Sequence, residues 1–395
     1  MSRMPLEEYG VNVNNKNILL VTSSYPDKDN VLIQGNFVKN QDDELKKYFK
    51  TVYIISPISI HHKFTETGRV CHDYSYDNIH VYFPYSVYLP LLYSRHITID
   101  TRLPMVKHII KVNNLKIDLI HAHMSEPSGY IAMKLKEVLE IPYVLTIHEN
   151  EIWFKNEVQM DHKKIINAWK KADALIRVNP YDIPLLKNYN PNSYYIANGY
   201  SPTFHPIDCK ICREKLGISM DKKILFGLGI LTKRKGFHFL IEAMNTIVKE
   251  HDNVICYIGG DGSERDHLEK MIHRYNLNDK VYLLGRISDE NLPLWMNACD
   301  LFVLPSQGEG NPTVMFEALG CGKPFIGTRV GGIPAIISSD EYGLMCEPGS
   351  ISSLHEVLEK ALSAEWDSNK ILEYAQQFMW KNICEKIVSI YKKIT

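Results

Sequence analysis

The sequence LFVLPSQGEGNPTVMFEALGCGKPFI, residues 301–326, contains a short apolar strand, a polar loop with glycines and the start of a helix. The strand ends at Pro305, and the helix begins near Pro312, because proline suits the first helical turn. A strand, loop and helix in this order form the repeating unit of a parallel sheet covered by helices. The amides of residues 311–314 are unpaired donors at the positive end of that helix, so the loop predicts a site for a phosphate-bearing ligand.

Two glutamates lie on either side of these amides. Glu309 is in the loop, and Glu317 is about one and a half turns into the helix. One carboxylate is thus available for a sugar and the other for vicinal hydroxyls such as a ribose diol. Two alternatives stay open from these residues alone. The pair could be a loop acid and a solvated helix face, or a hydrolase carboxylate pair, which must face each other across a scissile bond.

A second strand–loop–helix segment, GLGILTKRKGF, spans residues 227–237. Its strand ends at Gly229, and Lys233, Arg234 and Lys235 follow before Gly236 opens the next helix. Three cations at a strand end can neutralise a departing diphosphate, which is the main electrostatic demand in breaking a sugar–phosphate bond. The alternative is a basic turn that is simply solvated.

The same alternation of apolar runs and amphipathic stretches extends along the whole chain, which predicts parallel βαβ units and the α/β class. The predicted strands are 18–24, 52–58, 79–83, 117–121, 143–148, 174–178 and 194–197, and then 224–229, 254–259, 281–285, 301–305, 325–328 and 343–346. A length of 395 residues suits two doubly wound, Rossmann-like domains. The irregular segment 200–217 predicts their connection, with a boundary near residue 205. Such sheets bind ligands in a cleft at the carboxyl ends of their strands.

Together these segments resemble the retaining GT-B glycosyltransferases of family 4, the glycosyl transferases group 1. The E-x7-E element from Glu309 to Glu317 resembles the donor motif of that family, and GLGILTKRKGF resembles its G-R-L-x-x-x-K-G stretch. Other similar segments are YIGGDGSERDHL, CDLFVLPS, TRVGGIP, VLIQGNFVKNQDDELKK, IDLIHAHMSEPSGY, YVLTIHENEI and ANGYSPTFHP. The resemblance covers nearly the whole chain. It implies two domains facing across a cleft: an acceptor-side domain at 1–205, a donor-binding domain at 206–377 and a final helix, 378–395, that returns to the N-terminal domain.

The resemblance also assigns roles to single residues. Lys235 would contact the donor diphosphate, Glu317 the ribose hydroxyls, and Glu309 with the following amides the transferred sugar. The implied donor-binding set is Gly35, Gly229, Lys233, Arg234, Lys235, Gly285, Glu309, Gly310, Asn311, Pro312, Thr313 and Glu317. The implied catalytic set is His123, His148, Lys235 and Glu309.

Three of these residues belong to the N-terminal half. Gly35 begins a helix after the first strand and would face the phosphates, although an ordinary loop glycine is the alternative. His123 and His148 close two strands and would lie beside the reacting sugar, although a structural histidine is the alternative for each.

Elsewhere the chain departs from the family pattern: Ile230 stands where arginine is frequent, and Ala335 stands in place of a glutamate. Lys233 or Arg234 would then supply the missing diphosphate contact.

The implied reaction moves a hexose-type sugar from a nucleoside-diphosphate sugar, with a UDP-sugar favoured, to a hydroxyl of a glycan or lipid-linked acceptor. The anomeric configuration is retained, because the leaving phosphate stays on the attacked face and helps to deprotonate the acceptor. Polysaccharide or glycolipid biosynthesis is the expected setting. The alternatives are a GT-B epimerase and a sugar-nucleotide-binding protein without catalysis.

The composition gives no sign of a nucleic-acid partner, because the formal net charge is -1. The polar start has no signal-peptide core, and no apolar run approaches the ~20 residues that span a bilayer, so we expect a cytoplasmic protein. No metal and no cofactor are expected. The lone CxxC pair, Cys209 and Cys212, lacks a second pair for zinc. The DxD-like spelling at Asp27 and Asp29 falls in a loop and is interpreted as a turn.

Residues 82–116 combine the apolar run YFPYSVYLPLLY with basic side chains that include Lys107 and Lys111. An aromatic and aliphatic surface beside basic groups suits a lipid headgroup interface. We therefore expect peripheral contact with the inner face of a membrane through this segment. The alternative is that its tyrosines and leucines belong to the core.

Overall fold

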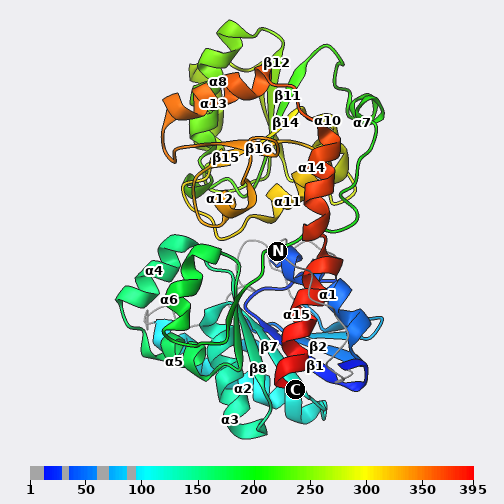
Figure 1. Cartoon of the computed structure of the whole chain (residues 1–395), viewed down its shortest axis with the longest axis vertical. Helices are drawn as coiled ribbons and strands as arrows, with labels where there is room; N and C mark the ends of the chain where they lie inside the picture. Colours follow the sequence, from blue (N-terminus) through cyan, green and yellow to red (C-terminus); the bar gives the residue numbers. More distant parts are fainter. Residues whose placement is uncertain (1–12, 29–34, 60–70, 87–94) are drawn as a thin grey trace. The chain divides into compact units, whose positions relative to one another are not determined.

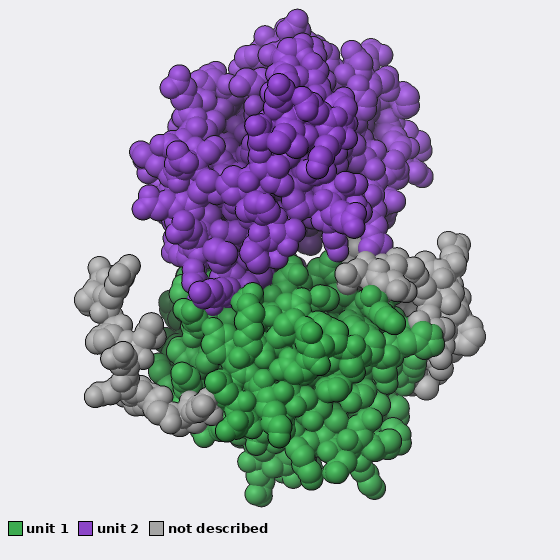
Figure 2. Space-filling view, turned by 90° about the vertical axis from the view of Figure 1, so that its right-hand side faces the viewer, with its two compact units in different colours: residues 1–149, 153–197, 383–395 green, residues 150–152, 198–382 purple. Residues whose placement is uncertain are grey.

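The computed structural model describes residues 13–28, 35–59, 71–86 and 95–395. Contacts within the chain divide it into two compact units (Figure 2). Unit 1 contains residues 1–149, 153–197 and 383–395, and unit 2 contains residues 150–152 and 198–382. The division thus falls after residues 197 and 382, where the sequence analysis places it after 205 and 377. Each unit is built around its own sheet of mainly parallel strands (Figure 1), which confirms the α/β class with two doubly wound sheets.

The described strands of the main sheet of unit 1 have the order β10-β9-β8-β7-β1-β2-β5-β4, and β4 alone among them runs antiparallel to its neighbour. They are β1 (Asn17–Thr22), β2 (Thr51–Ile55), β4 (Tyr74–Tyr76), β5 (Ile79–Tyr82), β7 (Leu119–His123), β8 (Tyr143–Ile147), β9 (Ala174–Arg177) and β10 (Ser193–Tyr195), while β3 (Ile58–Ser59) and β6 (Tyr85–Ser86) form a separate pair. β7 and β8 are buried along their whole length, as expected of parallel strands with helices on both faces.

The helices that lie wholly or mostly in unit 1 are α1 (Asn36–Leu45), α2 (Arg95–Val112), α3 (Tyr130–Leu139), α4 (Glu151–Gln159), α5 (Lys163–Lys171), α6 (Ile183–Lys187) and α15 (Trp380–Ile394). α5 presents a buried face that includes Trp169, which stacks on Phe154 of α4. The last helix, α15, packs beside α1 (Figure 1), where Cys384 contacts the carbonyl of Gln41.

The sheet of unit 2 has the order β13-β12-β11-β14-β15-β16, and all its strand pairs are parallel. Its strands are β11 (Lys223–Leu228), β12 (Val254–Gly259), β13 (Val281–Gly285), β14 (Leu301–Leu304), β15 (Phe325–Thr328) and β16 (Gly343–Cys346). Its helices are α7 (Cys209–Leu216), α8 (Phe237–Glu250), α9 (Arg265–Arg274), α10 (Leu292–Ala298), α11 (Thr313–Gly320), α12 (Ile333–Ile336), α13 (Ile351–Ser363) and α14 (Ser368–Ala375). The strand order changes direction between β11 and β14, and this is where such sheets bind ligands.

The predicted connection between the two domains differs from the structure. The segment 200–217, predicted as an irregular connection, contains α7, which Asp208 caps by accepting a hydrogen bond from the Lys210 amide. The hydrophobic pattern of α7 is weak because its buried residues are Cys212 and Arg213. The buried Arg213 donates a hydrogen bond to the Ala298 carbonyl. α3 begins at Tyr130, after a wider turn over Ser125–Gly129.

Candidate functional site

The residues predicted to hold the donor come together in unit 2, where the adjacent parallel strands β11 and β14 end. β11 leads through Gly229 into the short 3-10 turn Lys233–Lys235, and β14 leads into the loop before α11. Parallel strands end at the same edge of their sheet, so the two loops are neighbours although 74 residues separate Lys235 from Glu309. The site therefore lies at the switch point of the sheet.

Lys235 and Glu309 form an ion pair between these loops. Lys235 Nζ lies 2.7 Å from Glu309 Oε1, which also accepts a hydrogen bond of 2.7 Å from Ser306 Oγ. Arg234 Nη1 lies 3.3 Å from Glu309 Oε2 and donates a hydrogen bond of 2.6 Å to the Gly308 carbonyl. These contacts hold the basic turn against the acidic loop.

The ion pair decides the charge of the site. Burial raises the pKa of the Glu309 carboxyl, but Lys235 and Arg234 together lower it by more, so the pKa stays below its ordinary value. Glu309 is therefore ionised at neutral pH. Lys233, which is exposed, adds a third cation, and one carboxylate against three cations leaves a net charge suited to a diphosphate.

Two glycines let the loops approach this closely. The stem of Lys235 lies over Gly229, where a Cβ would come within 3.4 Å of two of its carbons. Gly236 has a φ of 71°, and a Cβ there would lie 2.0 Å from the Pro305 carbonyl oxygen. Gly236 is thus required by the backbone, whereas Gly229 leaves room for the lysine stem.

The first turn of α11 is available to an anion. Its N-cap is Pro312, which has no side-chain acceptor, so no side chain caps the amides that begin at Thr313. Asn311 is held by Asn198, whose amide N–H donates to its Oδ1 at 2.9 Å and whose Nδ2 donates to its carbonyl at 2.7 Å. Within the described residues, the buried Nδ2 of Asn311 has no hydrogen-bond partner. An unpaired buried donor is costly, so this N–H is a natural contact for a ligand oxygen.

Glu317 is buried on α11, and the alternative of a solvated helix face is therefore wrong. Burial raises the pKa of Glu317 to about 8, and the charge of Asp289 adds to this effect. The group is mostly protonated at neutral pH before any ligand binds. A buried carboxyl with a perturbed pKa at a strand edge is typical of functional sites.

The remaining predicted donor residues lie along the same edge of the sheet. Gly285 ends β13, and its carbonyl accepts a hydrogen bond of 2.8 Å from the Gly260 amide. Gly260 in turn lies against Gly229, where a Cβ would come within 1.9 Å of the carbonyl oxygen. Gly310 is buried in the acidic loop, where its carbonyl accepts a hydrogen bond from the Gly332 amide. Ile230, at the family's arginine position, is 50% exposed.

In unit 1 the structure brings His123 and His148 together. His123 ends β7 and His148 follows β8, and His123 Nδ1 lies 3.0 Å from His148 Nε2 with the rings stacked. Burial lowers the pKa of His123 to about 3, so its imidazole is neutral. His148 is less buried, and Phe37 of α1 contacts its ring edge.

Gly35 lies in the same unit, at the N-cap of α1. Its φ is 97°, and a Cβ would lie 2.5 Å from the Ser24 carbonyl oxygen at the end of β1. The backbone therefore requires glycine here whether or not a phosphate binds. The predicted approach of a ligand to Gly35 stays a prediction.

Sequence reasoning missed His121 as a member of the histidine cluster. His121 Nε2 lies 2.7 Å from Thr146 Oγ1, and its Nδ1 lies 2.6 Å from the hydroxyl of Tyr391 on α15. Burial, with His123 and His148, lowers the pKa of His121 far below its ordinary value. The i, i+2 spacing in HAH places both histidines on one face of a strand, a signal that could have found it. Tyr391 lies 270 residues away and gives no such signal.

The predicted membrane segment is partly described. Residues 87–94 lie outside the described residues, whereas α2 exposes Met105, Lys107, Lys111 and Val112. Among the helices of the described part of the chain, none combines the length and apolar character needed to cross a bilayer. The CxxC pair and the DxD-like spelling were the other sequence patterns considered for a metal. Cys212 of the CxxC pair is buried, and Asp29 of the DxD-like spelling lies outside the described residues.

Comparison with known proteins agrees with this architecture. The family models described as Glycosyltransferase Family 4 and Glycosyl transferases group 1 match residues 52–203 and 210–378. An uncharacterized glycosyltransferase of Methanocaldococcus jannaschii is 28% identical over 297 residues, which cover 70% of this chain and 75% of that protein.

Solved structures have the same fold at low sequence identity. A sucrose-phosphate synthase from Thermosynechococcus elongatus matches with a TM-score of 0.78 and 20% identity, over 96% of this chain and 99% of that one. HepE of Anabaena, solved with UDP, matches with a TM-score of 0.74 and 20% identity, over 96% and 100% of the two chains, and it has also been solved with UDP-glucose. With both family models matched and the GT-B fold confirmed, this chain belongs to glycosyltransferase family 4.

Proposed function

We propose that this glycosyltransferase moves a hexose-type sugar from a nucleoside-diphosphate sugar to a hydroxyl of a glycan or lipid-linked acceptor, with retention at the anomeric carbon. The observation that carries the proposal is the Lys235–Glu309 ion pair beside the uncapped start of α11. The basic turn provides cations and the first turn of α11 provides uncapped amides, both at the ends of the neighbouring strands β11 and β14. A diphosphate is bound by both kinds of group. The binding of UDP and UDP-glucose by HepE supports a UDP-sugar as the favoured donor.

The reaction exchanges one bond at the anomeric carbon for another. The bond to the diphosphate oxygen breaks, a bond to the acceptor oxygen forms on the same face, and the acceptor proton passes to the departing phosphate. Negative charge grows on the diphosphate as it leaves. Lys235 keeps N–H donors beyond the one that Glu309 accepts, and Arg234 lies beside it, so both stabilise this charge.

The two glutamates have separate roles in this proposal. Glu309, held by Lys235 and Ser306, keeps the lysine in place and offers its second oxygen to a sugar hydroxyl. Glu317 accepts hydrogen bonds from the ribose diol in its ionised form. Because its pKa is about 8 without ligand, donor binding must release its proton, which couples donor affinity to pH.

Of the two histidines, His123 would act without charge. His123 is neutral and buried behind its hydrogen bond to His148, which is the more exposed of the two. An imidazole exchanges hydrogen bonds with sugar hydroxyls, and the diphosphate charge is met by the lysine and arginine of unit 2. We therefore propose His148 as the contact to the sugar and His123 as the residue that orients it.

The donor and the reaction can be tested together. UDP-, GDP- and ADP-sugars are screened by thermal shift, since a ligand that binds the folded state raises the Tm. Nucleoside-diphosphate release is then measured with and without acceptor glycans or glycolipids. Acceptor-dependent release with an α-configured product from an α-configured donor supports the proposal. Binding without release supports the non-catalytic alternative, and a changed sugar without an acceptor supports an epimerase.

The acceptor side is tested separately. We propose that residues 82–116 contact an anionic membrane surface, because α2 exposes both basic and apolar side chains. Co-sedimentation with anionic liposomes at low salt should fall in a Lys107→Glu/Lys111→Glu variant. A Lys210→Glu/Lys215→Glu variant carries the same charge change on exposed positions of α7 and should sediment like the wild type. A wild type that stays in the supernatant would instead indicate a soluble acceptor.

A further inference from the structure

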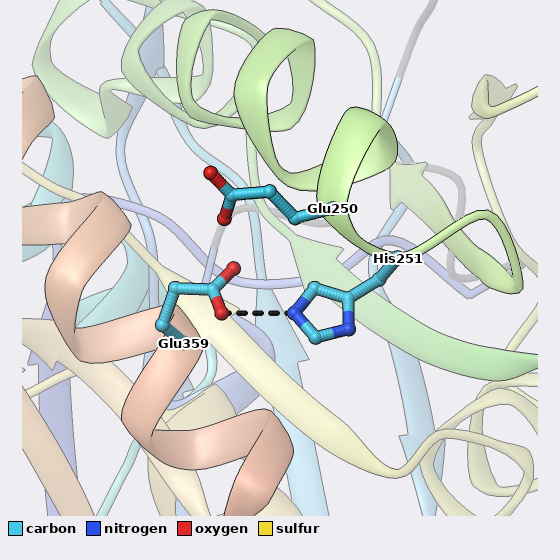
Figure 3. Close-up of side chains that lie close together, drawn as sticks. All are labelled: Glu250, His251 and Glu359. Carbon is cyan, nitrogen blue, oxygen red and sulfur yellow. Dashed lines mark hydrogen bonds and ion pairs between the residues drawn. The ribbon is translucent and has the colours of Figure 1, made fainter.

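Two histidines and two glutamates lie together where the end of α8 meets α13. Glu250 is the last residue of α8, His251 follows it, and His355 and Glu359 belong to α13. The two helices run side by side on unit 2 (Figure 1), and Figure 3 shows the side chains of Glu250, His251 and Glu359 converging between them. We call these four residues the His–Glu cluster.

The donor atoms of the cluster are closely spaced. His251 Nε2 lies 2.8 Å from Glu359 Oε2 (Figure 3), and His355 Nε2 lies 3.5 Å from Glu250 Oε2. One donor atom from each of Glu250, His251 and Glu359 can be chosen so that all lie within 4.8 Å of one another. In the part of the chain that the structure describes, no other group of three His, Cys, Asp or Glu side chains is this compact.

The chain itself brings these groups together. His355 and Glu359 are four residues apart and so lie on one face of α13. His251 has left the helical conformation, with φ of -133° and ψ of 93°, so its ring turns back toward α13 instead of continuing along α8. Two adjacent residues of one helix end thus face two residues of one helix turn.

Some polar atoms of the His–Glu cluster have no hydrogen-bond partner. Among the described residues, His355 Nε2 and Glu359 Oε1 are buried atoms without a hydrogen-bond partner. The distance of 3.5 Å between His355 Nε2 and Glu250 is longer than a good N–H···O hydrogen bond. Buried polar atoms without partners are costly, and in native proteins they often mark an ion or a water. Two of the four residues therefore have unused ligand atoms that face their neighbours.

We propose that the His–Glu cluster binds a divalent transition-metal ion of the zinc class. The ligands are Nε2 of His251 and His355 and one carboxylate oxygen each from Glu250 and Glu359. Two carboxylates balance the charge of the ion, and the imidazoles bind in their neutral form. A tetrahedral zinc with ligand distances of ~2.0–2.2 Å separates its ligand atoms by ~3.4 Å. The separations within the two pairs, 2.8 Å for His251 and Glu359 and 3.5 Å for His355 and Glu250, are near this value. Ligand atoms of Glu250, His251 and Glu359 already lie within 4.8 Å of one another, and side-chain rotation of His355 would bring in the fourth ligand.

The ion would act as a clamp between α8 and α13. Helix α8 begins at Phe237, directly after the basic turn, whereas the His–Glu cluster lies at its other end. Fourteen residues of helix span about 20 Å, so an ion here is remote from the proposed diphosphate site. The proposal concerns the stability of unit 2 and is independent of the proposed transfer reaction.

The test measures binding of Zn²⁺ to the full chain, freed of metal with a chelator. A Cys209→Ser parent is used, because Cys209 is the cysteine that is not buried and could bind zinc by itself. Stoichiometry and affinity come from competition with a chromogenic chelator, and the Zn²⁺-induced rise in Tm is measured against each variant's own metal-free Tm. Mg²⁺ serves as a second probe, because it prefers oxygen ligands to imidazole.

Glu250→Gln/Glu359→Gln and His355→Ala are the test variants, and Glu356→Gln, an exposed glutamate on the same helix, is the matched control. The parent and the control should bind one Zn²⁺ with a rise in Tm that Mg²⁺ does not reproduce. The test variants should bind at least about 10–100-fold more weakly, the loss typical even of residues that only support a metal ligand. Absence of stoichiometric binding by the parent would mean that the cluster is only a pair of ion pairs, and unchanged binding by the test variants would place the zinc elsewhere. Either result overturns the proposal.

Discussion

The side chains at the strand ends of the two units differ in charge. The ion pair of unit 2 and the histidine cluster of unit 1 nevertheless lie at the same kind of place, near the carboxyl ends of parallel strands. In unit 2, Lys235 and Glu309 are both charged and compensate each other at 2.7 Å. In unit 1, His121 and His123 are fully buried, and burial keeps both neutral by lowering their pKa values. Topology thus sets where a functional side chain lies, and the neighbouring side chains set whether it carries charge.

This contrast suits a reaction with one charged and one uncharged partner. The diphosphate of a nucleotide sugar needs cations, whereas sugar hydroxyls can also exchange hydrogen bonds with uncharged groups such as a neutral imidazole. Each cluster is also self-consistent: Glu309 is paired by two cations and a hydroxyl, and His121 is held at both ring nitrogens. The following experiments ask whether the two clusters really differ in this way.

The largest effect is expected from Lys235→Ala. Removing this cation takes the nearer of two cations from the buried Glu309 and a proposed donor from the developing diphosphate charge, so kcat/KM should fall by about 10²–10³. Lys233→Ala removes an equal charge from an exposed side chain of the same turn and should lose much less. Steady-state kinetics of both variants decide the matter, and equal losses would show that only the overall charge counts.

The next effect is a pH dependence of donor binding. Glu317 has a pKa of about 8 without ligand, and the ribose diol should bind its ionised form. Affinity should therefore rise with pH up to about 8, by at most about tenfold per pH unit. Titration with a nucleoside-diphosphate sugar by calorimetry between pH 6 and 9 measures it. Glu317→Gln should bind more weakly and lose this slope, and a slope that survives in the variant would have another origin.

The same substitution should stabilise the folded protein. Because the folded pKa of Glu317 is raised, its burial costs stability increasingly as pH rises from the unfolded value toward about 8. Glu317→Gln should thus raise the Tm more at pH 8.5 than at pH 5, by ~2–4 °C for each kcal/mol recovered. Thermal unfolding at the two pH values provides the comparison. A variant that is less stable at pH 8.5 would contradict the burial argument.

The neutral cluster predicts acid sensitivity. The pKa of His123 is about 3 in the folded protein against about 6.5 in an unfolded chain. Above pH 6.5 the imidazole is neutral in both states, so it does not change the free energy of unfolding with pH there. Stability should fall below that pH by up to about 1.4 kcal/mol per pH unit for this group. In urea titrations between pH 7 and 4.5, His123→Asn should show a shallower loss with falling pH than the wild type. His205→Asn changes an exposed histidine and should keep the wild-type slope, and identical slopes in both variants would contradict the prediction.

The smallest expected change concerns chelation. If the cations of unit 2 serve the diphosphate, as proposed, transfer should continue in EDTA at nearly its full rate. If the His–Glu cluster carries zinc, EDTA should lower the Tm and leave the initial rate unchanged at moderate temperature. A complete loss of rate that Mn²⁺ or Mg²⁺ restores would contradict this and bring Asp27 and Asp29 forward as candidate ligands.

Much of the fold was predictable because parallel sheets have a strong local signature. Buried strands such as β7, β8 and β14 appear as short apolar runs between amphipathic helices. α7 was missed because its buried face depends on an arginine and a cysteine, which carry little hydrophobic signal. Motif spacing found Lys235, Glu309 and Glu317 because each follows a strand end, but it gave no hint of Ser306 as a partner of Glu309.

The sequence by itself determined the family, the two-sheet architecture and the candidate residues at the strand ends, because these follow from local periodicity and short motifs. Only the tertiary structure decided the protonation states, since desolvation and partners come from residues far along the chain. Lys235 and Glu309 are 74 residues apart, Asn198 and Asn311 are 113 apart, and His121 and Tyr391 are 270 apart. The His–Glu cluster also depends on tertiary structure. Glu250 and His251 come close to ligand atoms of α13 only because α8 packs against α13.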